Sequence, residues 1–162
     1  MARTLFILLS LCAVAVLGTA DAAWAQERME KQFINPPGIF KHPAFTRVVT
    51  VKGPMKLVFV AGQTPSDIEY KPVASGDYRG QYIKVMESLD VQLKAAGATW
   101  DDVVYRRIFV LDVDKYLAVS RDPSTPKFGN PDRPPPSTLI GVTRLSNPDF
   151  LIEIDLMAIT GG

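Results

Sequence analysis

Two neighbouring runs near the end of the chain decide its fold: PPPSTLIGV at residues 134–142 and LIEIDLMA at residues 151–158. The three prolines fix the backbone and remove hydrogen-bond donors, so they predict a stiff loop that leads into a short strand. The second run alternates as a strand does, and it carries Glu153 and Asp155 on one of its faces. Because both faces of this strand are largely apolar, we expect helices to cover one face and a second subunit to cover the other.

The elements upstream of these runs follow from hydrophobic periodicity. Strands are predicted, from their β-branched and aromatic content, at residues 45–51, 57–61, 103–111, 137–142 and 150–159. The first two strands would form a hairpin, while residues 26–44 are predicted to be irregular and residues 121–136 to be a functional loop. Apolar residues at helical spacing predict a helix over residues 77–96, which Gly97 ends, and a shorter helix over residues 112–120. This order predicts an α+β fold in which two helices cover one face of a single β-sheet.

The first 25 residues have the composition of a secretory signal peptide. Arg3 supplies a positive charge, residues 5–17 form an apolar run, and Ala23-Trp24-Ala25 is a small-x-small cleavage signal. The run is shorter than the roughly 20 residues that a membrane helix needs, so we expect residues 1–25 to be removed, with an uncleaved anchor or a start-site artefact as the alternatives. The mature domain, residues 26–162, would then lie in the bacterial periplasm or outside the cell, without a membrane attachment.

Composition argues against several kinds of site. The only cysteine, Cys12, lies in the signal region, so the mature chain would have neither a disulfide nor a catalytic thiolate. With His42 as the sole histidine, no zinc site is expected. The formal net charge is +1 and no block of lysine or arginine stands out, so nucleic acid is not an expected partner. The sequence also lacks a glycine-rich phosphate loop and a nucleophile elbow.

Landmarks over nearly the whole mature chain resemble the RidA family, also called YjgF-like, of reactive-intermediate imine and enamine deaminases. They are VFVAGQTP at residues 58–65, Leu89, Leu93 and Ala96-Gly97 in the long helix, IFV at residues 108–110, the strand after Pro135, and IEI at residues 152–154. The resemblance implies a chorismate-mutase-like fold and a homotrimer with small-molecule clefts between its subunits. It also implies hydrolysis of imines or enamines to carbonyl compounds and ammonia, without a metal or an organic cofactor.

The same resemblance implies a set of site residues. Glu153 corresponds to the carboxylate that manages the proton, and Gly62 with Ala61 corresponds to the wall of the cleft. Ser137 stands where the family's best-studied branch has the arginine that binds the substrate carboxylate, and Ser137 and Thr138 would contact the ligand.

Two more positions depart from the family pattern. Phe45 stands for a tyrosine of the first strand, and Ser120 stands for an asparagine of the second helix. A hydroxyl cannot replace the charged, bidentate fork of a guanidinium. Arg107, Arg133 or an arginine of a neighbouring subunit would have to enter the cleft to restore the positive charge.

Two functions therefore remain open. Glu153 is either a catalytic acid and base or a structural carboxylate held by Arg107, Arg144 or backbone donors. The protein is accordingly an imine or enamine deaminase, or a non-catalytic member of the same fold that binds a small molecule or a protein. A ribonuclease or translation inhibitor, a third function attached to this family, is disfavoured by the near-neutral charge and the signal peptide.

Overall fold

The computed structural model describes residues 28–161. The predicted signal peptide and Cys12 lie outside the described residues. Within residues 28–161 the chain forms six strands, two α-helices and one turn of 3-10 helix. In chain order these are β1 (Glu30–Ile34), β2 (Val48–Lys52), β3 (Met55–Gln63), α1 (Tyr78–Ala95), η1 (Trp100–Asp102), β4 (Val103–Val110), α2 (Val113–Arg121), β5 (Ser137–Gly141) and β6 (Ile152–Gly161).

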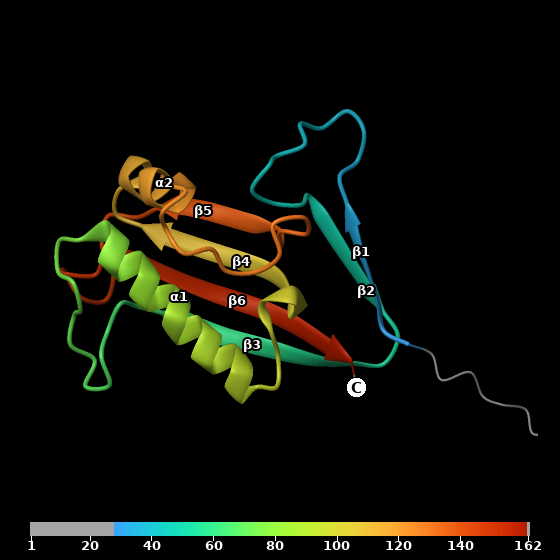
Figure 1. Ribbon diagram of the computed structural model, residues 1–162, viewed down its shortest axis with the longest axis horizontal. Helices are drawn as coiled ribbons and strands as arrows, with labels where there is room; N and C mark the ends of the chain where they lie inside the picture. Colours follow the sequence, from blue (N-terminus) through green and yellow to red (C-terminus); the bar gives the residue numbers. More distant parts are fainter. Residues whose placement is uncertain (1–27, 162) are drawn as a thin grey trace, which may run out of the picture.

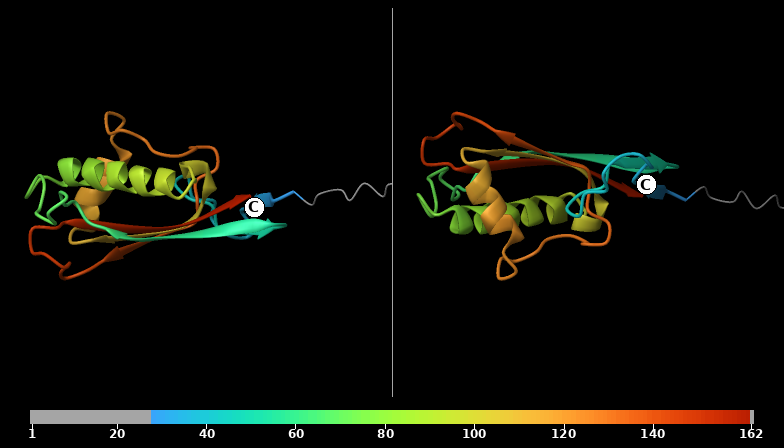
Figure 2. Two further views of the ribbon diagram at one scale, coloured as in Figure 1. Left: turned by 90° about the horizontal axis from the view of Figure 1, so that it is seen from below. Right: turned by 90° about the horizontal axis from the view of Figure 1, so that it is seen from above.

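Four of the strands form the main sheet, in the order β3-β6-β4-β5 (Figure 1). β6 lies antiparallel between β3 and β4, whereas β4 and β5 run parallel, with α2 in the crossover between them. Both helices pack on one face of this sheet, and the other face carries no helix of the described chain (Figure 2). The predicted α+β, chorismate-mutase-like arrangement, with two helices on one face of a sheet, is confirmed.

The hydrophobic core lies between α1 and the main sheet. Val85, Leu89 and Leu93 form the inner stripe of α1, and they are fully buried together with Ile152 and Ile154 of β6. Their spacing along the helix is the periodicity that predicted it. Fully burying side chains of this kind contributes roughly 1.5–3 kcal/mol each, so this layer holds the helix on the sheet.

The ends of α1 follow the local signals in the sequence. The Asp77 carboxylate accepts a hydrogen bond from the backbone N–H of Arg79 at 2.9 Å, which satisfies a donor of the first turn. Gly97 follows the helix with φ of +69°, a left-handed conformation in which glycine carries no steric penalty. The predicted helix over residues 77–96 is confirmed by α1, and the shorter predicted helix is confirmed by α2.

One buried polar side chain joins α1 to the start of β6. Gln81 is fully buried, donates to the carbonyl of Asp149 at 2.7 Å and accepts from the backbone N–H of Leu151 at 2.8 Å. Both polar ends of the amide are therefore satisfied inside the core, where an unpaired group would be costly. Gln81 thus fixes the turn between β5 and β6 relative to the helix layer.

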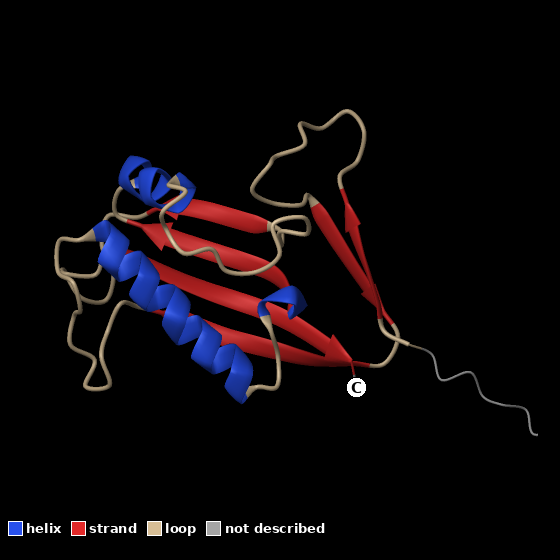
Figure 3. Cartoon of the chain, in the orientation of Figure 1, coloured by secondary structure: helices blue, strands red, loops and turns tan. Residues whose placement is uncertain are grey.

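The amino-terminal strands differ from the prediction. Residues 30–34, predicted to be irregular, form β1, and β1 pairs with β2 in a separate two-stranded sheet (Figure 3). The predicted hairpin between residues 45–51 and 57–61 is therefore wrong, because β3 pairs with β6 instead. Gly53, with φ of +95°, makes the break between β2 and β3, where a β-carbon would lie 2.8 Å from the Arg28 carbonyl oxygen.

Polar contacts of Lys31 and Thr46 help to hold this small sheet and the segment before β2 against the rest of the molecule. The Lys31 ammonium lies 2.8 Å from the Asp102 carboxylate, and the Thr46 backbone N–H donates to the Pro134 carbonyl at 3.1 Å. The Lys31–Asp102 pair is mostly buried, and the ammonium is one cause that lowers the pKa of Asp102 against the opposing effect of burial. The segment between β1 and β2 is thereby held beside the loop that precedes β5.

The face of the main sheet opposite the helices exposes large apolar side chains of β3 to solvent. Phe59 is 70% exposed and Leu57 is 52% exposed, both on β3. Large apolar side chains exposed side by side on a sheet are typical of a surface that another protein covers. In the described part of the chain, no helix is long and apolar enough to cross a membrane.

Candidate functional site

A cavity of about 810 Å³ lies on the helix side of the sheet, between α2, β4, β5 and the loop of residues 122–136. The segment before β2 closes one side of it through His42 and Phe45, whose rings stack at 4.2 Å between centroids. The cavity has an aromatic lining, made by Phe45, Tyr82, Trp100, Tyr116 and Phe128. Its volume lies within the range of about 300–1,000 Å³ that is usual for small-molecule sites.

The charged side chains around the cavity are all basic. Arg106, Arg121 and Lys127 line it, and none of the described residues that line it is an aspartate or a glutamate. Lys127 is occupied by the carbonyls of Ser120 and Asp122, at 2.9 and 2.8 Å from its ammonium. The cavity therefore favours an anion over a cation.

Ser137 and Arg106 meet in this cavity because β4 and β5 pair in parallel, with the two residues opposite each other. The Arg106 Nε donates to the Ser137 Oγ at 3.1 Å, and that hydroxyl donates to the Pro135 carbonyl at 3.1 Å. Sequence reasoning missed Arg106. Its neighbour Arg107 points to the opposite face of the sheet, and the Arg133 guanidinium lies over the Phe33 ring, 5.9 Å from its centroid.

Two tyrosines form the inner wall of the cavity. Burial raises the pKa of Tyr116 to about 12 and also raises the pKa of Tyr82, while the Arg106 charge acts in the opposite direction on both. Their rings meet edge to face at 6.1 Å between centroids. Both phenols therefore stay neutral at physiological pH and present apolar rings to whatever occupies the cavity.

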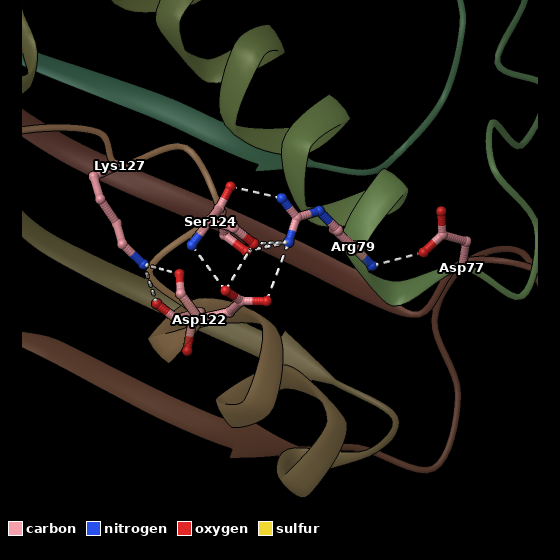
Figure 4. Close-up of polar contacts among 7 residues, drawn as sticks. Asp77, Arg79, Asp122, Ser124 and Lys127 are labelled. Atoms are coloured by element: carbon pink, nitrogen blue, oxygen red, sulfur yellow. Dashed lines mark hydrogen bonds and ion pairs between the residues drawn. The ribbon is translucent and has the colours of Figure 1, made fainter.

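The loop of residues 122–136, which carries part of the lining, is fastened to the first turn of α1 (Figure 4). The Arg79 guanidinium donates to the Asp122 carboxylate at 3.2 Å, to the Thr125 hydroxyl at 3.1 Å and to the Ser124 carbonyl at 2.6 Å. The Ser124 backbone N–H and hydroxyl also donate to Asp122 and, with the Arg79 charge, lower the pKa of that carboxyl. Arg79 therefore anchors the first part of the loop, residues 122–125, to α1.

Glu153 lies on the other face of the sheet, against the backbone of β3. A β-carbon placed on Gly62 would lie 2.1 Å from the Glu153 Oε1, so the carboxyl occupies the space that a side chain at Gly62 would need. Glu153 has no hydrogen-bond or ion-pair partner among residues 28–161. Burial, and then the negative charge of Asp155, raise the pKa of Glu153 above its ordinary value of 4.5.

The neighbouring groups on this open face are paired with one another. Arg107 holds Asp155 with two contacts, Nε to Oδ1 at 3.1 Å and Nη2 to Oδ2 at 2.6 Å. The hydroxyls of Thr138 and Tyr105 lie 2.9 Å apart. Because Arg107 is engaged with Asp155, it does not neutralise Glu153, and the carboxyl of Glu153 is left for a ligand or a second subunit.

Comparison with known proteins agrees with this geometry. Residues 41–160 match the family described as endoribonuclease L-PSP. A RutC family protein of Pyrococcus abyssi is 33% identical over 101 residues, which cover 62% of this chain and 76% of that protein. The chain belongs to the RidA-like, or endoribonuclease L-PSP, family.

Solved structures of RidA-like proteins share the fold. A protein of unknown function of the conserved Rid protein family from Yersinia pestis matches with a TM-score of 0.67 and 26% identity, covering 80% of this chain and 98% of that one. A putative endoribonuclease from Thermotoga maritima matches with a TM-score of 0.56 and 26% identity, covering 81% of this chain and 98% of that one.

The residues that the RidA resemblance singled out fall into two groups in one protomer. Phe45, Ser120 and Ser137 line the cavity on the helix side. Glu153 lies beside Gly62 on the open face, where Thr138 and Ala61 are exposed. The structure therefore does not bring all seven residues to one place, and the sheet separates Ser137 from Glu153.

Neither group of this RidA-like chain has the composition of a metal centre. Among residues 28–161, no three histidine, cysteine, aspartate or glutamate side chains come together in an arrangement that could hold a metal ion. At these two places the groups available for chemistry are the Glu153 carboxyl, hydroxyls, the Arg106 guanidinium and backbone groups.

Proposed function

We propose that this RidA-like protein is exported and hydrolyses imines or enamines of small metabolites to carbonyl compounds and ammonia. The observation that carries the proposal is the Glu153 carboxyl, which lies unpaired against the backbone of Gly62 with a raised pKa. A carboxyl whose pKa is raised toward the working pH exchanges a proton more readily than an ordinary surface glutamate.

In the proposed reaction, Glu153 takes a proton from a water molecule as the water oxygen attacks the imine carbon. The carbon–oxygen bond forms while the carbon–nitrogen double bond becomes a single bond, and Glu153 returns the proton to the nitrogen. Glu153 then carries the hydroxyl proton of this tetrahedral intermediate to the nitrogen as the carbon–nitrogen bond breaks, which forms the carbonyl group and releases ammonia. An enamine enters the same route after the protonated Glu153 donates its proton to the enamine carbon, which gives the iminium ion; the hydroxyl proton then returns to Glu153 when ammonia leaves.

The two groups of site residues would meet between copies of the chain. The open face carries Phe59 and Leu57 on β3 as well as Glu153 on β6, and exposed apolar side chains of this kind would be buried in an assembly. We propose a homotrimer in which the cavity of one copy lies next to the Glu153 of its neighbour. This arrangement would combine a binding cavity with a proton-transfer group that one protomer keeps on opposite faces of its sheet.

The test is ammonia release from freshly generated imines by the mature chain, compared with release in buffer alone. We expect turnover in the wild type and a loss of at least about 100-fold in Glu153→Gln, the usual range for removing an acid–base group. Glu87→Gln, which removes a carboxylate from the exposed face of α1, serves as the matched control. Turnover that is no faster than buffer would remove the deaminase proposal.

A second candidate function is ligand binding without catalysis. The observation that favours it is the placement of the cavity, which lies on the helix side of the sheet while Glu153 lies on the other side. In that case Glu153→Gln would bind ligands as the wild type does, and neither form would release ammonia.

A further inference from the structure

The Arg106 guanidinium carries a positive charge for which the described chain provides no counter-ion. It is half-buried, and its one side-chain hydrogen bond among residues 28–161 runs from Nε to the Ser137 hydroxyl. Two other arginines of the described chain pair with carboxylates, Arg107 with Asp155 and Arg79 with Asp122. A half-buried arginine without a carboxylate partner loses part of its hydration, and among residues 28–161 only the Ser137 hydroxyl replaces it.

The geometry of Arg106 leaves its outer edge available. The Ser137 hydroxyl accepts a hydrogen bond from Nε and donates one to the Pro135 carbonyl, so it fixes one side of the guanidinium. The two terminal nitrogens have no partner within the described chain. A pair of parallel N–H donors at the tip of an arginine matches the two oxygens of a carboxylate.

The charges around the cavity set the charge of its ligand. Arg106 is half-buried, whereas Arg121 and Lys127 are exposed, and the Lys127 ammonium already donates to two carbonyls. One inward cation is balanced by one negative charge, which favours a carboxylate over a dianionic phosphate. No acidic residue lines the cavity to oppose such a ligand.

The size and lining of the cavity indicate what the ligand carries besides its carboxylate. About 810 Å³ is far more space than a carboxylate alone fills, and the wall next to Arg106 consists of Tyr82, Tyr116 and Leu139. Trp100 and Phe128 complete it, with their rings 5.6 Å apart. Aromatic walls of this extent favour a ligand with an aromatic or similarly large apolar body.

We propose that Arg106, oriented by Ser137, binds the carboxylate of an aromatic acid whose ring occupies this cavity. Arg106 thereby supplies, from the neighbouring strand, the positive charge that Ser137 lacks. The inference deepens the proposed function, since it rests on this cavity being the ligand site and names the class of ligand. Ser137 acts through Arg106 as a positioning residue.

The experiment is calorimetric binding of stable probes to the mature chain, which needs no turnover. 3-Phenylpropionate carries the proposed ring and carboxylate, 3-phenylpropionamide keeps the ring without the charge, and propionate keeps the charge without the ring. We expect 3-phenylpropionate to bind about tenfold to 100-fold more tightly than either, the effect of one or two charge-assisted hydrogen bonds or of a buried ring. Phenyl phosphate tests whether the cavity prefers a dianionic phosphate to a carboxylate.

Variants test whether Arg106 supplies the positive charge that binds the carboxylate. Arg106→Gln should lose the preference for the acid over the amide, while Arg144→Gln, which removes an arginine from an exposed turn outside the cavity, should keep it. Ser137→Ala should weaken binding of the acid severalfold and leave binding of the amide unchanged. The ratio of the affinities for 3-phenylpropionate and 3-phenylpropionamide is also measured on the wild type. The wild-type ratio can therefore refute the proposal even if Arg106→Gln does not fold.

Three results would overturn the inference: equal affinity of wild type for acid and amide, unchanged selectivity in a folded Arg106→Gln variant, or tighter binding of phenyl phosphate. Absence of binding of 3-phenylpropionate at millimolar concentration would overturn it as well. Ammonia release from small imines with no binding of 3-phenylpropionate would sink the inference and leave the proposed function standing. Binding of 3-phenylpropionate without any ammonia release would support the inference and contradict the proposed deaminase activity.

Discussion

Glu153 illustrates how a single carboxyl can be set apart by its surroundings. It shares one face of β6 with Asp155, but Arg107 neutralises only Asp155. Half-burial then disfavours the charged form of Glu153, and the adjacent negative charge adds to the effect, so the two carboxyls of one strand have different environments. The folded protein therefore binds a proton at Glu153 more strongly than the unfolded chain does.

This difference predicts a pH-dependent effect of Glu153→Gln on stability. The stability that comes from the protonated form of Glu153 is present in full below the unfolded pKa, near 4.5, and is lost as the pH rises through the raised folded pKa. We expect Glu153→Gln to have the same Tm as the wild type at pH 4 and a Tm higher by a few degrees at pH 7. Thermal unfolding at both pH values checks this, with Glu87→Gln as the control.

Gly62 is predicted to matter for the position of Glu153 more than for stability. An alanine at this position would collide with the Glu153 carboxyl, a flexible group that can swing away, so we expect the free energy of unfolding to change by less than about 1 kcal/mol. Displacement of the carboxyl should lower ammonia release at least about tenfold, because proton transfer requires hydrogen-bond reach. Gly161→Ala, where no atom lies within 4 Å, is the control for adding a methyl group. A Gly62→Ala variant with full turnover would contradict the proposed role of Glu153.

At the scale of elements, the connection between α1 and β6 depends on the buried amide of Gln81. Gln81→Met would fill similar space but leave the Asp149 carbonyl and the Leu151 N–H without partners. Each buried unsatisfied group costs about 1–3 kcal/mol, so we expect a loss of about 2–4 kcal/mol in urea unfolding. Gln92→Met on the same helix is the comparison: the half-buried Gln92 amide has one hydrogen bond among residues 28–161, to the Gln63 side chain, and its loss should cost less than about 1 kcal/mol.

The loop of residues 122–136 should loosen when its attachment to α1 is removed. Arg79→Ala deletes every hydrogen bond that the guanidinium makes to Asp122, Ser124 and Thr125. We expect faster amide hydrogen exchange in residues 122–131 and weaker binding in the cavity, with about 1 kcal/mol or less of global stability lost, because the ion pair itself is exposed. Lys84→Ala on the same helix should leave exchange in that loop unchanged. An increase spread evenly over the protein would argue against a local attachment.

The success of sequence reasoning differs between helices and strand pairs. α1 and α2 could be placed because their apolar spacing and their caps, Asp77 and Asp112, are local properties. Strand partners are not local. The run EKQFI in β1 alternates but is short, and nothing within it shows that it pairs with β2.

The same reason explains what was missed in the site. Glu153 and Gly62 could be named from the resemblance, and they do lie side by side. Arg106 could not be connected with Ser137 from the sequence, because their contact depends on the parallel register of β4 and β5. The sequence did show that Arg106 and Arg107, as consecutive residues of a strand, point to opposite faces of the sheet. This alternation could assign Arg106 to the site only once β5 was known to be the neighbouring strand.

At the scale of the whole molecule, the open face of the sheet should determine the assembly. Phe59→Lys places a charge on the β3 side of this face without touching the core on the other side of the sheet. We expect the wild type to have the mass of a trimer in light scattering coupled to gel filtration, and Phe59→Lys to have the mass of a monomer. Val91→Lys, at a residue of α1 that is 66% exposed, is the control. An unchanged mass for Phe59→Lys would place the subunit contact elsewhere.

β3 is also the outer strand of the main sheet, with β6 as its one neighbour in the described chain. Its central run LVFVA, residues 57–61, has neither charge nor proline, and such a run on an unpaired edge readily recruits strands from other molecules. Protomers kept apart after synthesis are therefore prone to aggregate through this edge before they find their partners. Yield on refolding should depend on protein concentration, and a lysine within this run would act as a gatekeeper against fibrous deposits.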